Sequence, residues 1–165
     1  MTREATNSKR NAGQTDFGCS VKTLIERVTY SPEETMAFGR DLAASLNAPC
    51  LVLLEGDLGS GKTTLVKGIV SGLGAAQEEE VTSPSFALVH EYGSEGKVYH
   101  VDLYRIEEAR DLATLGLEDL LRPTTAVLVE WGEKLGDCIP TPYVRIRMAL
   151  LGKNERRIDV ERVAP

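Results

Sequence analysis

The stretch GDLGSGKT at residues 56–63 decides the fold, because it fits a phosphate-binding pattern of a glycine, four residues of any kind, a glycine, a lysine, and a serine or threonine. Its glycines let the backbone curl so that successive amide N–H groups point inward at phosphate oxygens. A helix that begins at Lys62 adds its positive N-terminal end at the same place. Lys62 can then reach the β- and γ-phosphates of a nucleotide, and the Thr63 hydroxyl can bind Mg²⁺.

The residues on either side of this stretch supply the context that the motif needs. Residues 51–54 are a continuous apolar run bounded by turn residues, which is typical of a central strand covered on both faces. Residues 62–72 carry apolar side chains at helical spacing, and Gly72 or Gly74 can provide the C-terminal turn. A strand, a glycine-rich loop and a helix in this order favour nucleotide binding over a merely flexible turn.

The remaining periodic segments predict an α/β fold. The run at residues 126–129 is a second fully apolar strand, and a turn at residues 152–154 joins two strands in a C-terminal hairpin. The acidic run at residues 78–80 is expected to be a solvated loop. Strands are expected at residues 23–29, 51–54, 86–92, 97–103, 126–129, 144–151 and 157–163, and helices at residues 31–47, 62–72 and 107–121.

Two carboxylates at strand ends are candidates for holding a metal or its waters and for orienting an attacking water. Asp102 ends the mixed strand at residues 97–103, whereas Glu130 ends the better apolar strand and is the stronger candidate on pattern alone. Which acid contacts the metal directly stays open. Trp131 follows Glu130, so it is either an ordinary core or rim aromatic or a residue that stacks near a base or a partner.

Three other polar residues are weaker candidates. His90 and His100 lie in expected strands, where a histidine is more often packed or solvent-facing than catalytic. Arg105 can offer positive charge to phosphates, although a solvated arginine is the more frequent outcome.

Length and composition indicate one globular domain. The chain has 165 residues, of which 42% are hydrophobic and 27% are charged, both close to globular averages. Residues 1–20 have the polar, aperiodic composition of a mobile tail, so a single domain is expected over residues 21–165. The formal net charge of −6 argues against a broad basic face for nucleic acid.

Several features favour a cytoplasmic protein. The longest uncharged stretch, residues 42–54, is too short for a membrane-spanning helix, and the first residues lack the apolar segment of a signal peptide. The three cysteines, Cys19, Cys50 and Cys138, are odd in number and widely spaced, which favours reduced thiols over a disulfide framework or a zinc site. Cys50 opens an apolar run and is interpreted as a buried small hydrophobic residue.

The nucleotide is expected to be ATP. A guanine-recognition motif would read Asn-Lys-x-Asp, and none of the four asparagines is followed by lysine. About 100 residues follow the loop, mostly in short strands, which leaves little room for the lid and acceptor pocket of a small-molecule kinase. Such a minimal domain fits an ATPase that works on or with another protein.

The chain resembles the TsaE (YjeE-type) ATPases of bacterial tRNA threonylcarbamoyladenosine biosynthesis. The resemblance runs from about residue 24 to residue 163, and the order and spacing of its blocks make it specific. Ser85 stands where the family usually has threonine, which preserves the hydroxyl, and the tail before residue 20 is unmatched. The blocks are residues 56–64, 81–86, 100–105 and 129–131, with residues 115–119 also similar.

The resemblance implies a P-loop NTPase-like three-layer sandwich, in which a central, mainly parallel sheet is extended by antiparallel strands. In it Asp102 matches the Walker B aspartate, Glu130 the second essential acid, and Trp131 a residue beside the nucleotide. Residues 82–86 match a switch-like loop near the γ-phosphate. The family's ATPase is weak alone, and its ATP cycle resets a partner complex of TsaB and TsaD, which carries out the transfer to adenosine next to the anticodon.

The hypothesis from the sequence is therefore a Mg²⁺-dependent ATPase subunit of tRNA modification, with TsaB-like and TsaD-like partners. A small-molecule phosphotransferase and a nucleotide-dependent protein switch without useful hydrolysis remain alternatives. Contact with tRNA is expected to be indirect, or local through Arg145, Arg147, Arg156 and Arg157, although an ordinary solvated hairpin is the favoured reading of that strip. The expected catalytic residues are Lys62, Asp102 and Glu130, the metal ligands are Thr63, Glu130 and Asp102, and the nucleotide-binding residues are Asp57, Leu58, Gly59, Ser60, Gly61, Lys62, Thr63, Thr64 and Trp131.

Overall fold

The computed structural model describes residues 21–94, 97–123, 125–137, 139–140 and 142–165. The predicted tail at residues 1–20, together with Cys19 and Cys138, lies outside these residues, and the single domain over residues 21–165 stays a prediction. The strands are β1 (Val21–Thr29), β2 (Cys50–Glu55), β3 (Val89–Tyr92), β4 (Val98–Asp102), β5 (Ala126–Glu130), β6 (Tyr143–Leu150) and β7 (Arg156–Val163). The helices are α1 (Pro32–Ala43), α2 (Lys62–Gly72), α3 (Ala109–Thr114) and α4 (Leu117–Leu120), with 3₁₀ helices η1 (Glu78–Glu80) and η2 (Gly132–Leu135).

The strands form one seven-stranded mixed sheet in the order β1-β7-β6-β2-β5-β4-β3. Parallel pairing joins β6, β2, β5 and β4 at its centre. Antiparallel pairing adds β3 at one edge and β7 and then β1 at the other. The expected α/β class, with a parallel core extended by antiparallel strands, is confirmed.

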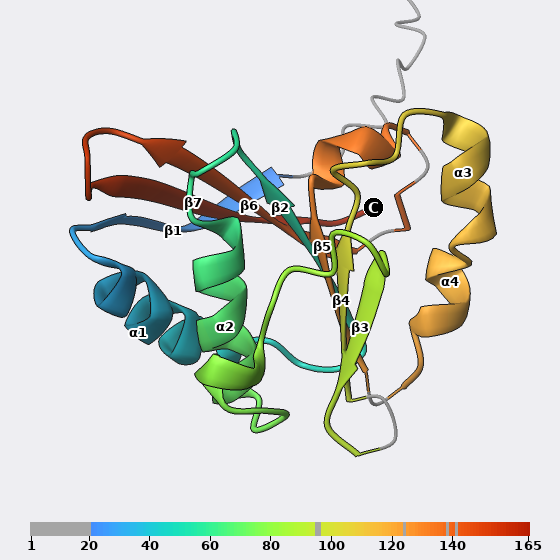
Figure 1. Cartoon of the computed structure of the whole chain (residues 1–165), viewed down its shortest axis with the longest axis horizontal. Coiled ribbons are helices and arrows are strands. Elements are labelled where there is room, and N and C mark those ends of the chain that lie inside the picture. Colours follow the sequence, from blue (N-terminus) through green and yellow to red (C-terminus); the bar gives the residue numbers. More distant parts are fainter. Residues whose placement is uncertain (1–20, 95–96, 124, 138, 141) are drawn as a thin grey trace, which may run out of the picture.

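Helices cover both faces of the sheet (Figure 1). α1 and α2 lie against each other on one face, and α3 and α4 lie on the other. Because β2 and β5 are apolar along their length, they supply side chains to both cores: Leu54 and Leu128 pack under α1 and α2, whereas Leu53 and Val129 pack on the opposite side. The four central strands run in the same direction, so their carboxyl ends meet at one edge of the sheet. Both faces of the sheet are buried.

The helix expected at residues 31–47 ends at Ala43, and the amides of residues 45 and 46 bond to carbonyls three residues back in a turn. Two other expected elements are shorter or more broken than the sequence pattern indicates. The strand expected at residues 86–92 begins only at Val89, because Leu88 takes a left-handed φ of 65° and its amide bonds to the Pro84 carbonyl at 2.8 Å. The helix expected at residues 107–121 is two short helices, since Gly116 lies between them with φ 56°. Both expectations were wrong where a local left-handed residue interrupts the apolar pattern.

The acidic run at residues 78–80 is largely exposed to solvent, as expected, but it is not an irregular loop. It forms the 3₁₀ helix η1, and the Glu80 carboxylate accepts a hydrogen bond from the Gln77 amide at 2.7 Å. Glu78 forms an ion pair with Arg40 of α1. Local capping and a contact between helices order a segment that composition alone assigns to an irregular loop.

Cys50 is half-buried at the start of β2, and burial raises the pKa of its thiol to about 11. The thiol therefore stays protonated at neutral pH, in keeping with a packing role. In the described part of the chain, no helix combines the length and apolar character that crossing a membrane requires.

The packing of α1 on α2 depends on a close approach at Gly68. A Cβ atom there would lie 2.1 Å from the Met36 carbonyl oxygen of α1, well inside van der Waals contact. The neighbouring helix backbone cannot move aside without separating the two helices. The short interhelical distance therefore requires glycine at this position.

Replacing Gly68 with alanine is expected to lower the free energy of unfolding by about 1–3 kcal/mol, because the added methyl group overpacks the interface. Urea unfolding of the purified variant measures this change. Gly152→Ala is the matched control, since its Cβ would lie 3.6 Å from the nearest atom, and it should change stability by less than about 0.5 kcal/mol. Equal unfolding midpoints for the two variants would contradict this view of the interface.

Candidate nucleotide site

The stretch at residues 56–63 forms the loop between β2 and α2, as the motif requires. Gly61 is the residue just before α2 and has φ 98°, a conformation that side chains with a Cβ rarely adopt. The first turn of α2 contains no acidic residue and receives no side-chain cap from Gly61. Its amide groups and the positive end of the helix dipole are therefore available to an anion.

The Lys62 ammonium lies inside the loop. Its Nζ donates to the carbonyl oxygens of Gly56 at 2.5 Å and Asp57 at 2.9 Å, and it lies 4.2 Å from the centroid of the Trp131 ring. Burial lowers the pKa of Lys62 from its ordinary value, while nearby carboxylates, Glu130 foremost, oppose that shift. The site thus holds a buried cation next to a cluster of acids.

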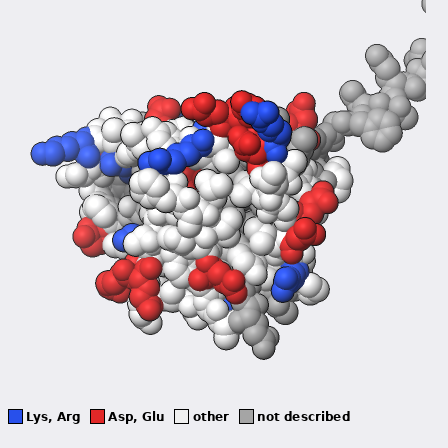
Figure 2. Space-filling view, turned by 45° about the vertical axis from the view of Figure 1, so that its right-hand side comes forward, with Lys and Arg blue, Asp and Glu red and all other residues white. Residues whose placement is uncertain are grey.

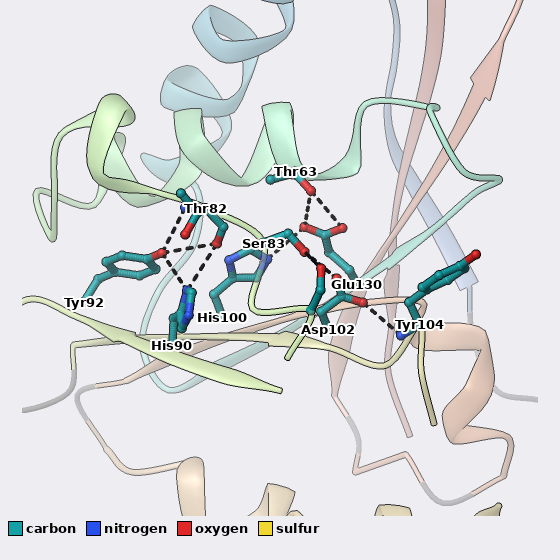
Figure 3. A network of polar contacts seen from close by, with 10 residues as sticks. Thr63, Thr82, Ser83, His90, Tyr92, His100, Asp102, Tyr104 and Glu130 are labelled. Atoms are coloured by element: carbon teal, nitrogen blue, oxygen red, sulfur yellow. Dashed lines mark hydrogen bonds and ion pairs between the residues drawn. The ribbon is translucent and has the colours of Figure 1, made fainter. Parts of the chain in front are cut away.

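Glu130 and Asp102 are direct neighbours across the parallel pair β5 and β4. Both are almost completely buried, at 3% and 4% exposure. Glu130 accepts a hydrogen bond from the Thr63 hydroxyl, with distances of 2.8 Å to Oε1 and 3.1 Å to Oε2. Asp102 instead accepts from the Ser83 hydroxyl at 2.5 Å and from the Tyr104 amide at 2.9 Å (Figure 3). The acid that meets the threonine of α2 is therefore Glu130, whereas Asp102 meets the loop at residues 82–86.

These groups line a cleft of about 480 Å³, within the range of roughly 300–1,000 Å³ that is common for small-molecule sites. The sequence-predicted residues Asp57 and Ser60 are not part of its lining: Asp57 is exposed, and Ser60 is buried behind the loop with its hydroxyl 3.4 Å from Lys62 Nζ. The lining comprises Leu58, Gly59, Gly61, Lys62, Thr63, Thr64, Ser83, Ser85, Asp102, Tyr104, Arg105, Glu130, Trp131 and Arg156.

The donor set at the base of the cleft fits Mg²⁺. The Thr63 hydroxyl and the carboxylates of Glu130 and Asp102 are all oxygen donors, which is the ligand type that Mg²⁺ prefers. Mg²⁺ usually takes one or two carboxylates and fills its remaining positions with water and substrate phosphates. The residues present therefore match a metal that shares its coordination with a bound nucleotide.

Trp131 and Tyr104 form an aromatic wall of this cleft. Their ring centroids are 5.1 Å apart, and Trp131 has a left-handed φ of 59°, which is uncommon for a bulky residue. This backbone turn, placed directly after β5, directs the indole back over Lys62. Positional strain of this kind is concentrated at functional sites, and here it fixes an aromatic face beside the loop.

Of the three weaker candidates, Arg105 lines this cleft, whereas His90 and His100 do not. His90 lies near the Thr82 carbonyl oxygen, with its Nδ1 3.3 Å away, and Arg105 lies over the Phe86 ring at 4.2 Å from its centroid. His100 is fully buried and contacts Glu130. The sequence pattern favours a packed or solvent-facing histidine, and for His100 it does not reveal the contact with the acid.

The four arginines of the hairpin do not form one basic strip, because adjacent strand residues face opposite sides of the sheet. Arg145, Arg147 and Arg157 pair with the carboxylates of Glu55, Glu161 and Asp159 at 3.0, 3.0 and 3.1 Å. Figure 2 shows acidic and basic side chains interspersed along the upper edge of the molecule. This agrees with the favoured reading of a solvated hairpin for three of the four residues.

Arg156 faces the opposite side and lines the cleft. Its Nη1 makes only long contacts of 3.4 Å with the carbonyl oxygens of residues 152, 153 and 155, and within the described part of the chain it has no carboxylate in ion-pair distance. Sequence reasoning placed Arg156 in a surface strip. The alternation of side chains along β7, which places Arg156 and Arg157 on opposite faces, can be predicted from the sequence. The position of β7 beside the glycine-rich loop cannot.

Comparison with known proteins agrees with this arrangement. Residues 29–158 match the family model described as threonylcarbamoyl adenosine biosynthesis protein TsaE. Proteins named tRNA threonylcarbamoyladenosine biosynthesis protein TsaE are 34% identical in Treponema pallidum (81% of this chain and 97% of that protein) and 37% identical in Bacillus subtilis (79% and 80%). The one from Haemophilus influenzae is 38% identical over 72% of this chain and 79% of its own length.

The fold comparison gives the same result. The crystal structure of Bacillus subtilis YdiB superposes with a TM-score of 0.69 and 33% sequence identity, covering 89% of this chain and 90% of that one. Because the family match spans most of the described residues and includes the loop and both acids, the chain belongs to the TsaE family of tRNA threonylcarbamoyladenosine biosynthesis proteins.

Proposed function

We propose that this protein is a Mg²⁺-dependent ATPase subunit of the system that makes threonylcarbamoyladenosine next to the anticodon in tRNA. Its ATP cycle acts on a partner complex of TsaB-like and TsaD-like proteins and does not itself perform the transfer. The observation that carries the proposal is the contact between the Thr63 hydroxyl and the Glu130 carboxylate, beside an uncapped helix N-terminus. The family to which the chain belongs supports the pathway.

Each group in the cleft has a role that its chemistry supports. Main-chain amides of residues 57–64 and the Lys62 ammonium hold the phosphates, with Lys62 leaving its carbonyl partners for the β- and γ-oxygens. Thr63 and Glu130 hold the metal, and bound Mg²⁺ supplies charge neutralisation at those oxygens. Asp102 would orient the attacking water, and Trp131 would form a wall beside the nucleotide.

Asp102 also connects the site to the loop at residues 82–86. Ser83 bonds to Asp102 at 2.5 Å and lies 3.0 Å from the Ser85 hydroxyl, and both serines line the cleft. These two hydroxyls share the cleft with Lys62 and Thr63. This proximity supports a loop that lies near the γ-phosphate and changes position between ATP and ADP, as the family resemblance implies.

Exposed apolar side chains around the cleft support a protein partner. Leu58 is 73% exposed and Tyr104 is 46% exposed, and both line the cleft. Phe86 is 86% exposed and stacks with Arg105. Large apolar groups gathered at the mouth of one site are typical of an interaction surface. A cytoplasmic location and any direct tRNA contact remain predictions.

The proposal predicts that TsaB-like and TsaD-like proteins capture this chain in a nucleotide-dependent manner and raise its ATP turnover. Copurification in ATP and in ADP, followed by turnover with and without the partners, measures both effects. Equal capture in both nucleotides, together with absent turnover in the complex, contradicts the proposal. Stimulation by a metabolite instead of a protein would indicate a phosphotransferase, and nucleotide-dependent capture without turnover would indicate a switch.

Removing either acid is expected to slow turnover on the order of 10²-fold while leaving much of the nucleotide affinity, because phosphoryl transfer depends on positioned charge. The variants are Glu130→Gln and Asp102→Asn, assayed for kcat with the partners present and for ATP binding by calorimetry. Asp159→Asn serves as control, because Asp159 pairs with Arg157 and does not line the cleft. If both site variants turned over ATP at the parent rate, the assigned roles would be wrong.

Arg156 is expected to contribute a charge to nucleotide binding, because it lines the cleft without an ion-pair partner among the described residues. Arg156→Met should weaken MgATP binding by about tenfold or more, the usual size of a lost charged hydrogen bond. The adjacent Arg157→Met is the matched control, since Arg157 pairs with Asp159 on the opposite face. Calorimetry that gives the same affinity for both variants would remove Arg156 from the site.

A further inference from the structure

His100 occupies an unusual position for a core residue. It lies in the middle of β4 with no exposed surface, and its side chain points to the same face of the sheet as Glu130 (Figure 3). Its Nε2 atom lies 2.8 Å from Glu130 Oε1. Burying an imidazole here costs free energy unless it is hydrogen-bonded, and an apolar side chain of similar size would fill the same space without that cost. The contact with Glu130 is therefore the feature that requires explanation.

The hydrogen-bonding chemistry fixes where the imidazole hydrogen lies. A carboxylate only accepts hydrogen bonds, so the atom facing Glu130 must be a donor, and His100 carries its hydrogen on Nε2. The Nδ1 atom is buried and has no hydrogen-bond partner in the described part of the chain. A second N–H at Nδ1 would be a buried donor without an acceptor, so the geometry favours the tautomer with its hydrogen on Nε2 alone.

The two oxygens of Glu130 are held unequally. Oε1 accepts from His100 at 2.8 Å and from the Thr63 hydroxyl at 2.8 Å, whereas Oε2 lies only near the Thr63 hydroxyl, at 3.1 Å. The terminal torsion of a glutamate is broad, and without a second donor the carboxylate can rotate about it. His100 on one side and Thr63 on the other stop that rotation. The oxygen with spare acceptor capacity is then Oε2.

We propose that His100 is a positioning residue: its Nε2–H holds Oε1 of Glu130, which leaves Oε2 to face the metal next to Thr63. This inference rests on the proposed ATPase function, since it assigns a second residue to the site that binds MgATP. His100 does not line the cleft and acts through Glu130. Residues that orient a metal-binding carboxylate typically change metal affinity or activity by about 10–100-fold when they are replaced.

Two substitutions separate positioning from packing. His100→Leu keeps a similar volume and removes the donor, whereas His100→Gln places an amide N–H near the position of Nε2. With the partners present, His100→Leu is expected to lower kcat by about 10–100-fold and to raise the Mg²⁺ concentration for half-maximal turnover, with the KM for ATP changing less than about twofold. His100→Gln should recover most of the lost kcat.

A buried control shows what loss of packing alone does. Val101→Ala removes bulk from the same strand, but Val101 packs on the opposite face of the sheet. This variant should lower the unfolding temperature and leave kcat at the parent value. If His100→Leu and His100→Gln lose kcat equally, or if Val101→Ala loses as much kcat as His100→Leu, the positioning role is wrong.

A readout that needs no turnover comes from the small number of histidines. The chain contains two, so the ring nitrogens of His100 can be assigned by ¹⁵N NMR of histidine-labelled protein. The inference predicts an Nε2–H tautomer at His100 and a change in that signal in Glu130→Gln. An Nδ1–H tautomer, or a signal that does not respond to Glu130→Gln, overturns the inference. Absent MgATP binding in the parent protein instead overturns the proposed function, with the tautomer unaffected.

Discussion

The hydrogen bond between Thr63 and Glu130 connects the two halves of the site. It exists because β5 pairs in parallel with β2, with Leu54 opposite Glu130, so the end of β5 lies beside the loop that follows β2. Parallel strands end at the same edge of a sheet, and that edge is where the helix α2 begins. A shift of one residue in this pairing would turn the Glu130 side chain to the opposite face of the sheet.

The surrounding polar groups are almost all satisfied by contacts that cross between elements. Glu130 lies between α2 and β4, Asp102 bonds to the loop at residues 82–86, and Lys62 bonds to carbonyls of its own loop. Burying three charged groups this closely is costly unless each has a partner of opposite charge or a hydrogen bond. The site therefore has low tolerance for side chains that differ in charge or length.

The sequence predicted those parts of the site that are encoded locally. The loop at residues 56–63, the helix after it and the apolar strand that ends in Glu130 are each readable from neighbouring residues, and the structure has all of them. The contact of His100 with Glu130 spans thirty residues of sequence and depends on the register of β4 against β5. Arg156 likewise enters the cleft because of where β7 lies in the sheet, which local patterns do not encode. Two expected elements are shorter because Leu88 and Gly116 have left-handed backbone conformations, and the apolar spacing of the residues around them does not reveal this.

The proposed site depends most on Thr63 and Glu130 acting together on bound MgATP. Calorimetry of the parent, Thr63→Val, Glu130→Gln and the double variant gives the coupling free energy between the two side chains. Because the two groups are proposed to share a metal, we expect modest single losses of MgATP affinity that are not additive, with a coupling of at least about 0.5 kcal/mol. Additive losses within about 0.5 kcal/mol would mean that the two groups do not share a metal, and this would contradict the proposed site.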